Sequence, residues 1–265
     1  MRKTIQHVCI IFVMLFLYMP ILILAFYSFT SSTMIGSIRG FSLDNYVTLF
    51  TESELISMMV GTVLLAIGVG LLSTILGTVG AIGAFYSKKG IRLGIEFANE
   101  VPIVNADVVT GFSVCVLLIV LLHIDKATYI PLVIAQTALC APFVYLSVTP
   151  RLKQMDSALY EAGLDLGCTP SQALFKIVIP QIFPGILSGF MTAITLSLDD
   201  YFIATYTKPA TFDTISTYVV NATRGAQTQI KTALWALSAI IFVIVILFVI
   251  GININSAKNA EEENR

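Results

Sequence analysis

Six long apolar stretches alternate with polar segments along the chain. They run over about Val8–Phe29, Val60–Tyr86, Val104–Leu122, Tyr129–Val148, Ile182–Tyr206 and Ala233–Ile252. Because about twenty apolar residues in a helix cross the hydrocarbon core of a bilayer, each stretch predicts one transmembrane helix. The pattern therefore predicts an all-α integral membrane protein with six spans.

The first stretch has the features of an uncleaved span. It is longer than the apolar region of a signal peptide and lacks a cleavage site of the small-x-small type. Pro20 predicts a kink within it. The following polar segment contains FSLDNY at residues 41–46, which predicts a turn and then a helix start at the membrane surface.

The second stretch is rich in glycine. The pairs Gly77/Ala81 and Gly80/Ala84 have the small-xxx-small spacing that lets two membrane helices approach closely. We therefore expect this span to lie inside a helix bundle.

The third stretch is harder to delimit, because residues 93–122 are apolar overall but include polar side chains near their middle. We expect the first part to lie at the interface and residues 104–122 to cross the membrane. Glu100 and Asp107, seven residues apart, would share a helix face. They are secondary candidates for a substrate path, and an interfacial helix start explains them equally well.

Composition agrees with membrane insertion and excludes other classes. Hydrophobic residues make up 57% and charged residues 12% of the 265 residues, whereas charged residues alone reach about 25% in soluble domains. The formal net charge of -1 offers no basic patch for nucleic acid. Four scattered cysteines without CxxC spacing suggest neither a disulfide framework nor a metal site.

A polar interruption at Arg151–Pro180, here called the knob, separates the fourth and fifth stretches. Asp156 or Ser157 is suited to cap a first short helix. Gly167 stands where that helix would end in the left-handed conformation. A second helix is expected to begin with a capping box and to stop before Pro180. The residues that indicate it are Thr169, Pro170 and Gln172.

The apolar residues of the first knob helix, Leu159, Ala162 and Leu166, fall on one face. An amphipathic connector lying on the bilayer surface fits this periodicity equally well.

Particular residues of the knob favour a more specific interpretation. Three groups of residues carry the match: Glu161-Ala162-Gly163, then Gly167, and, after nine intervening residues, Ile177 to Pro180. Their types and spacing resemble the EAA loop of ABC importer permeases. Gly163 and Ile179 replace an alanine and a leucine of that pattern, small for small and apolar for apolar. The resemblance implies a type I ABC importer fold, with the knob as a cytoplasmic two-helix coupling loop that docks on an ATPase.

The same resemblance implies a non-catalytic subunit and a set of partners. No GxxxxGK[ST] motif is present, so ATP and Mg²⁺ are expected on a separate ATPase dimer and no cofactor in this chain. A second permease subunit, by family analogy a paralogue, an extracytoplasmic binding protein and membrane lipid complete the expected surroundings.

The distribution of lysine and arginine predicts the orientation. With six spans, ten of these residues lie on the side of the termini and the knob, against five on the other side. The positive-inside rule places the more basic side in the cytoplasm of a bacterial inner-membrane protein.

Adjacent carboxylates near the end of the fifth stretch, Asp199 and Asp200, are the main candidates for substrate contact. An aspartate at the membrane centre costs roughly 2.5–3.5 kcal/mol, so the pair demands a partner, water or protonation. A polar stripe at helical spacing would line a path; it comprises Ser188, Thr192, Thr195, Asp199 and Tyr206. Asp200 would lie about 100° around the same helix, so we expect one carboxylate to face the path directly and the other to bind a neighbouring helix. Interfacial snorkelling is the alternative.

The segment LSLDDYFIATYTKPA and the residues Pro102 to Val109 resemble spermidine/putrescine ABC permeases of the C type. The resemblance implies a polyamine substrate. Carboxylates attract polyamine cations, and Tyr201, Phe202 and Tyr206 offer ring faces for cation–π contact, although an interfacial aromatic belt explains them more simply.

Other functions remain open at this point. One alternative is an ABC permease for another small solute, such as an amino-acid-like compound or a metal ion. Another alternative is a sensor. An intramembrane aspartyl protease is disfavoured, because its two carboxylates must face each other across helices. We expect the first span and outer loop at residues 1–55, the transmembrane domain at 56–252 and a disordered cytoplasmic tail at 253–265.

Overall fold

The computed structural model describes residues 2–31, 40–156, 158–224 and 232–243. Within these ranges the chain is helical, apart from one isolated bridge between Thr30 and Phe41. It divides into two compact units, Met1–Ser57 with Val219–Arg265, and Met58–Tyr218. Each unit is described by itself.

The first unit contains the predicted first span. Helix α1 covers Arg2–Ser28 and passes through Pro20, and α2 covers Asp44–Thr51. The helix start expected after FSLD is thus confirmed. Asn45 Nδ2 donates to the carbonyls of Ser28 and Thr30 at 2.9 and 3.0 Å, which satisfies carbonyl groups at the end of α1.

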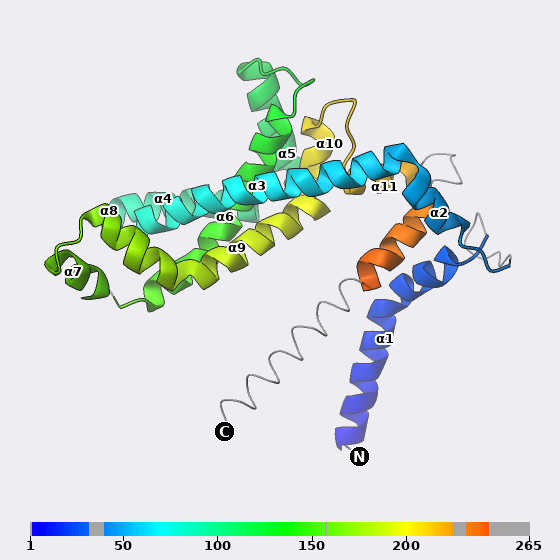
Figure 1. Cartoon of the computed structure of the whole chain (residues 1–265), viewed down its shortest axis with the longest axis horizontal. Coiled ribbons are helices and arrows are strands. Elements are labelled where there is room, and N and C mark those ends of the chain that lie inside the picture. Colours follow the sequence, from blue (N-terminus) through cyan, green and yellow to red (C-terminus); the bar gives the residue numbers. More distant parts are fainter. Residues whose placement is uncertain (1, 32–39, 157, 225–231, 244–265) are drawn as a thin grey trace. The chain divides into compact units, whose positions relative to one another are not determined.

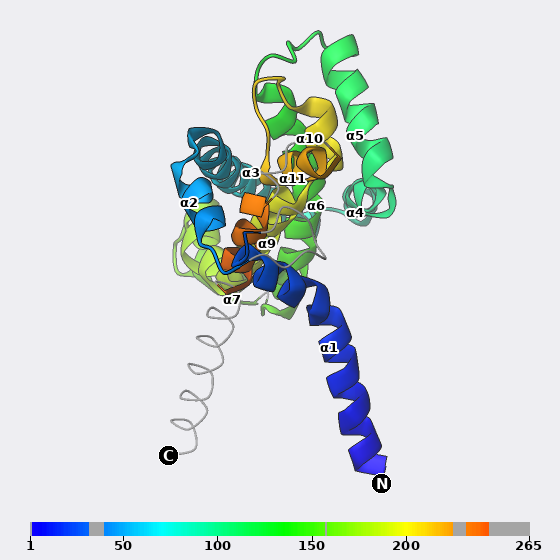
Figure 2. The same ribbon diagram turned by 90° about the vertical axis from the view of Figure 1, so that its right-hand side faces the viewer.

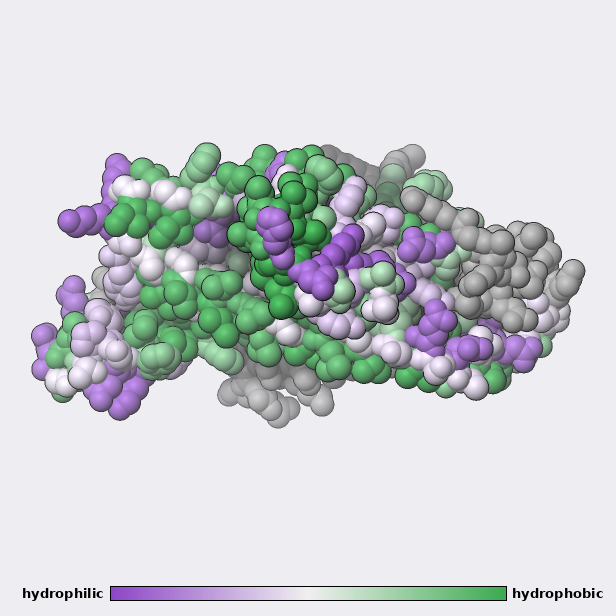
Figure 3. Space-filling model, turned by 90° about the horizontal axis from the view of Figure 1, so that it is seen from above, coloured by the Kyte–Doolittle hydropathy of each residue, from purple (hydrophilic) through white to green (hydrophobic). Residues whose placement is uncertain are grey.

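The second unit is built on three long helices that pack closely. Helix α3 covers Ser53–Tyr86, α6 covers Ile130–Gln154, and α9 covers Ile179–Asp199 (Figure 1). Their contact is lined by buried residues of all three helices, among them Val69, Ala81, Ala84, Cys140, Val144, Val148, Ile182 and Ala193. Much of the outward surface is hydrophobic (Figure 3), as at Val79, which is 65% exposed. Such a surface suits contact with lipid.

The glycine of the predicted packing motif lies at the closest approach of α3 and α6. A Cβ on Gly77 would lie 2.6 Å from Val144 Cβ and 2.7 Å from the Ala141 carbonyl oxygen. Ala81 and Ala84 are buried one and two turns further on. One face of α3 thus packs within the bundle, as expected, while its other face, which includes Val79, is exposed.

The third apolar stretch is broken. Helix α4, Lys89–Val104, is followed by α5, Asp107–Cys115, which continues as the π-helical η1, Val116–Leu121. The two parts meet at an angle of 109°. The expected boundary near residue 104 is confirmed. The prediction that Glu100 and Asp107 share a helix face is wrong, because the extended backbone at residues 105 and 106 separates their helices.

The fifth stretch is also broken. Helix α9 ends at Asp199, the backbone at Asp200 is extended with φ −64° and ψ 115°, and a short helix α10 covers Phe202–Thr207. Helices α5 and α10 lie side by side (Figure 1 and Figure 2). The prediction of one continuous helix over residues 182–206 is therefore wrong, and so is the placement of Asp200 on that helix.

The second knob helix does not stop before Pro180. Helix α8, Pro170–Ala173, continues through the π-helical η2, Leu174–Val178, into α9. Ile179 N–H donates to the carbonyl of Leu174, five residues back. A proline lacks an N–H and its ring clashes with the carbonyl four residues before it. The wider π turn adjusts the backbone at this point, so the helix passes the proline.

Four described helices are long and apolar enough to span a membrane, and the bent α4–α5 pair makes a fifth if the pair crosses as one span. The predicted sixth span is described only as an apolar helix over Thr232–Val243. The rest of that stretch, and the expected tail at 253–265, lie outside the described residues. Helix α11, Ile215–Arg224, completes the elements.

Candidate functional site

The knob lies at one end of the α6–α9 pair and is held by the local bonds that the sequence predicts (Figure 1). Its first helix, α7, covers Ala158–Asp165, and Asp156 Oδ1 accepts a hydrogen bond from Ala158 N at 2.9 Å. Asp156 is thus a confirmed cap, while Ser157 lies outside the described residues. Gly167 has φ +87°, the left-handed conformation that glycine adopts without strain.

The predicted capping box of the second knob helix is confirmed. Gln172 N donates to Thr169 Oγ1 at 3.4 Å, and Thr169 N donates to Gln172 Oε1 at 3.0 Å. These two bonds satisfy amide groups at the start of α8 that no helical carbonyl reaches. The corner between α7 and α8 therefore has a defined geometry.

One face of α7 packs against the rest of the second unit. Gly163 is buried, and Ile177 Cδ1 occupies the space that a Cβ on this residue would need. This contact explains glycine at a position where the EAA pattern has alanine. Tyr160 also packs on Tyr86 at the end of α3, with ring centroids 5.2 Å apart. Tyr160 thus connects α7 to the end of α3.

The opposite face of α7 is exposed and apolar. Leu166 is 87% exposed and Leu159 is 43% exposed, with Ala162 and Glu161 also exposed. Leu159 lies on α7 and Leu166 follows its last residue, Asp165, so the exposed leucines belong to the helix and to the corner after it. Of the remaining predicted knob residues, Ile177 is half-buried and Pro180 exposed.

The two adjacent aspartates differ sharply in their surroundings. Asp199 is exposed at the last residue of α9, whereas Asp200 is 8% exposed. Asp200 Oδ1 accepts from Ile203 N at 3.0 Å, and its Oδ2 accepts from Ala204 N at 2.9 Å. Asp200 therefore binds two of the free amide groups at the start of α10.

Asp200 also bonds to a residue of the neighbouring helix α6. Gln136 Nε2 donates to Asp200 Oδ2 at 2.8 Å, and Gln136 Oε1 accepts from Ser197 Oγ at 2.9 Å. Gln136 is fully buried. Gln136 is not among the site residues that the sequence predicts. The feature that could have revealed Gln136 is that it is the single amide side chain in an otherwise apolar stretch. A polar side chain in a membrane segment requires a hydrogen-bond partner.

The predicted polar stripe is only partly present. Thr192 and Thr195 lie on α9 as expected, and their hydroxyls bond back to the carbonyls of Ser188 and Met191. Tyr206 lies on α10 and packs against Phe112 of α5, with ring centroids 6.0 Å apart. The single stripe that included Tyr206 is therefore wrong, because the break at Asp200 interrupts the helical spacing.

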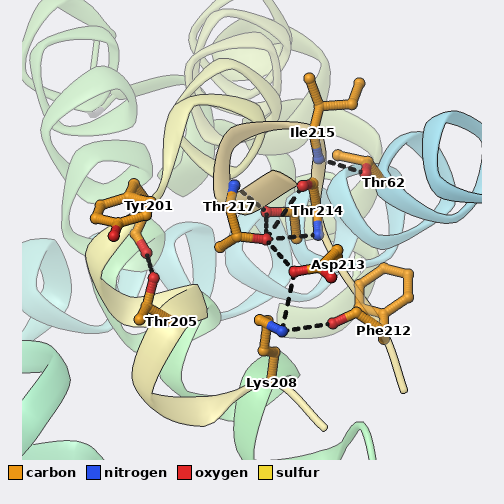
Figure 4. Close-up of polar contacts among 9 residues, drawn as sticks. All are labelled: Thr62, Tyr201, Thr205, Lys208, Phe212, Asp213, Thr214, Ile215 and Thr217. Atoms are coloured by element: carbon orange, nitrogen blue, oxygen red, sulfur yellow. Dashed lines mark hydrogen bonds and ion pairs between the residues drawn. The ribbon is translucent and has the colours of Figure 1, made fainter. Parts of the chain in front are cut away.

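The segment after α10 forms a polar network (Figure 4). Lys208 Nζ lies 3.0 Å from Asp213 Oδ1 and donates to the Phe212 carbonyl at 2.9 Å. Thr217 Oγ1 donates to Asp213 Oδ1, and Ile215 N donates to Thr62 Oγ1 on α3. Tyr201 and Thr205 lie apart from this network and are joined by a bond from the Thr205 hydroxyl to the Tyr201 carbonyl.

The secondary candidates lie on other helices than the aspartate pair, and Asp107 is near enough to Asp200 for their charges to interact. Glu100 lines a surface depression of about 520 Å³ together with Phe97, Val101, Val104 and Asn105. Asp107 is exposed at the first turn of α5. Neither carboxylate has a hydrogen bond to Asp199 or Asp200.

Taken together, the fold and the site define an all-helical, multi-pass membrane protein with a two-helix knob that exposes an apolar face. The family model of binding-protein-dependent transport system inner membrane components matches residues 1–258, and the protein belongs to this family. The resemblance of the knob to the EAA loop of importer permeases agrees with that membership.

Relatives with assigned transport roles cover most of the chain. The putrescine transport system permease protein PotI of Escherichia coli (strain K12) is 32% identical over 219 residues, which are 79% of this chain and 76% of PotI. The spermidine/putrescine transport system permease protein PotC of Haemophilus influenzae is 27% identical over 244 residues, 92% of this chain and 93% of PotC.

Solved structures share the fold. A chain of the bacterial alginate ABC transporter in complex with an alginate pentasaccharide-bound periplasmic protein has a TM-score of 0.70 at 20% identity, covering 93% of this chain and 91% of that chain. An amino acid ABC transporter crystallised with histidines has a TM-score of 0.53 at 16% identity, covering 79% and 94%. The expected type I ABC importer fold is thereby confirmed.

Proposed function

We propose that this chain is the permease subunit through which an ATP-driven importer moves spermidine or putrescine across the bacterial inner membrane. The observation that carries the substrate class is its similarity, over most of its length, to two polyamine permeases. The exposed carboxylate of Asp199 supports the same class, because polyamines are multiply charged cations at neutral pH.

The proposal includes partners that supply what this chain lacks. An ATPase dimer holds ATP and Mg²⁺ and docks on the knob, with Glu161 and Gly167 at the coupling positions and the exposed leucines of α7 at the contact. A second permease subunit, a paralogue, forms the other wall of the path. An extracytoplasmic binding protein delivers the polyamine, and the chain itself catalyses no reaction.

The proposed orientation places both termini and the knob in the cytoplasm. It rests on the excess of lysine and arginine on that side. ATP binding would draw the ATPases together, and α7 would pass the movement through Tyr160 to Tyr86. The path would then alternate between two states of access.

The proposed substrate path runs along the exposed side of α9. Thr192, Thr195 and Asp199 lie on this helix, with Tyr201 following the break. Glu100 and Asp107 are secondary candidates on α4 and α5, and Tyr206 is a further aromatic candidate on α10.

Neutralising Asp199 tests the path. We expect the Asp199→Asn variant to take up labelled spermidine and putrescine at least tenfold more slowly, because a favourable charge interaction worth about 1.4 kcal/mol is lost. Uptake is measured in vesicles that contain the complete transporter. The matched control is Asp125→Asn, which removes an exposed carboxylate from a turn and keeps its acceptor for Ala127 N.

Two results would contradict parts of this proposal. Unchanged uptake by the Asp199→Asn transporter would remove this carboxylate from the path. Uptake of an amino-acid-like solute or a metal ion by the wild-type transporter, with none of either polyamine, would overturn the substrate class. A sensor, the remaining alternative, predicts that no ATPase copurifies with the chain.

A further inference from the structure

Adjacent in sequence, Asp199 and Asp200 have different surroundings in the fold. We propose that only Asp199 meets the substrate, and that Asp200 is a positioning residue that holds the break between α9 and α10. This division of roles rests on the proposed transport function and goes beyond it, because helical spacing predicts that one carboxylate faces the path and the other binds a neighbouring helix but does not decide which.

The first argument is the occupancy of the Asp200 carboxylate. Its two oxygens accept three hydrogen bonds, from Ile203 N, Ala204 N and Gln136 Nε2, at 2.8 to 3.0 Å. Only 8% of the residue is exposed. A carboxylate offers about four acceptor positions, so about one stays open here, and the burial of the residue keeps a passing ammonium group from reaching it. Asp199, in contrast, is exposed at the end of its helix.

The second argument is that the bonds of Asp200 connect several segments at one point. Through Gln136 the carboxylate is joined to α6 and to Ser197 of α9. The Asp200 carbonyl accepts from Ser216 Oγ, in the first turn of α11, at 2.9 Å. Buried polar groups that are fully hydrogen-bonded specify one local arrangement. This network therefore determines where α9 ends.

The third argument concerns what the break does for Asp199. The sequence from Ser197 to Tyr206 is compatible with an uninterrupted helix, yet the backbone at Asp200 is extended. Because of the break, Asp199 is the last residue of α9, and α9 itself has no further turn after it. Because Asp200 caps α10 on the other side of the break, loss of the cap would change the surroundings of the Asp199 side chain.

Uptake by conservative and non-conservative variants distinguishes the two roles. An asparagine at position 200 retains an oxygen for Ala204 N and Gln136 Nε2, but it carries no charge. We expect Asp200→Asn to retain at least a third of wild-type uptake, whereas Asp200→Ala and Gln136→Leu lose at least fivefold. At position 199, where charge is needed, Asn and Ala are expected to be equally defective. All rates are expressed per assembled transporter.

A second measurement reports the position of residue 199 without requiring transport. The four native cysteines are replaced by alanine and Asp199→Cys is introduced into the complete transporter. The rate of its modification by a membrane-impermeant methanethiosulfonate reagent is then compared with and without Gln136→Leu. We expect at least a threefold change in rate per folded molecule, with the elution volume of the complex unaltered. A role confined to folding would alter the amount of complex instead.

The results that overturn the proposal are specific. Equal loss of uptake in Asp200→Asn and Asp200→Ala would mean that charge at position 200 is itself required. Unchanged modification of the introduced cysteine in the Gln136→Leu background would mean that the network does not position residue 199. If the wild-type transporter moved neither polyamine, the proposed function would fail, while the modification rates would still decide the positioning role.

Discussion

A Leu166→Asp variant is expected to lose its ATPase partner while folding as the wild type does. Leu166 is 87% exposed on the knob, so its replacement removes almost no contact within the chain. If the ATPase covers this side chain, its burial contributes about 1.5–3 kcal/mol, and a buried aspartate adds a further penalty. We therefore expect at least a tenfold weaker association.

The association is measured by copurification of the ATPase and by stimulation of its activity. Leu122→Asp is the matched control, because Leu122 is an exposed leucine, 59% exposed, beyond the end of η1 and outside the knob. It should retain the ATPase. Glu161→Ala provides a second variant on the same helix and is expected to weaken the association in the same direction.

Retention of the ATPase by both knob variants would show that the exposed face of α7 is not the docking surface. Protection of a Leu166→Cys thiol from a membrane-impermeant methanethiosulfonate reagent, in the absence of the ATPase, would instead favour the connector on the bilayer surface that the periodicity also allows.

A Gly77→Ala variant is expected to be strongly destabilised. The added methyl group would lie 2.6 Å from Val144 Cβ and 2.7 Å from the backbone oxygen of Ala141. A side chain can rotate away, but a backbone carbonyl within α6 cannot move without displacing the helix. Overpacking of this kind costs about 1–3 kcal/mol, and we expect a lower melting temperature and a smaller yield of monodisperse protein.

Gly80→Ala is the matched control for that experiment. It lies three residues further along α3, and the nearest atom to its added methyl group is Tyr145 Cδ2 at 3.8 Å, an ordinary contact distance. Both variants change helix propensity in the same favourable direction. Equal melting temperatures for the two variants would therefore contradict the close approach of α3 and α6 at Gly77.

The structure confirms several predicted features of the knob, and each of them depends on residues that are close together in the sequence. The Thr169–Gln172 capping box and the Asp156 cap join groups two or three residues apart. Gly167 is recognisable because few other residues adopt its backbone conformation. The direction of the α7 apolar face was not predictable in this way, since its exposure depends on the packing of Gly163 against Ile177.

Amino-acid sequence alone determined the class of this protein, the main apolar helices and the capped corner of the knob. Hydropathy and capping depend on residues that are close together in the sequence, so both can be predicted from it. Tertiary structure decided the breaks in the third and fifth stretches, the continuation of the knob helix past Pro180 and the different surroundings of Asp199 and Asp200. The break at Asp200 involves a bond to Gln136, 64 residues away in sequence, and helical periodicity contains no information about so distant a partner.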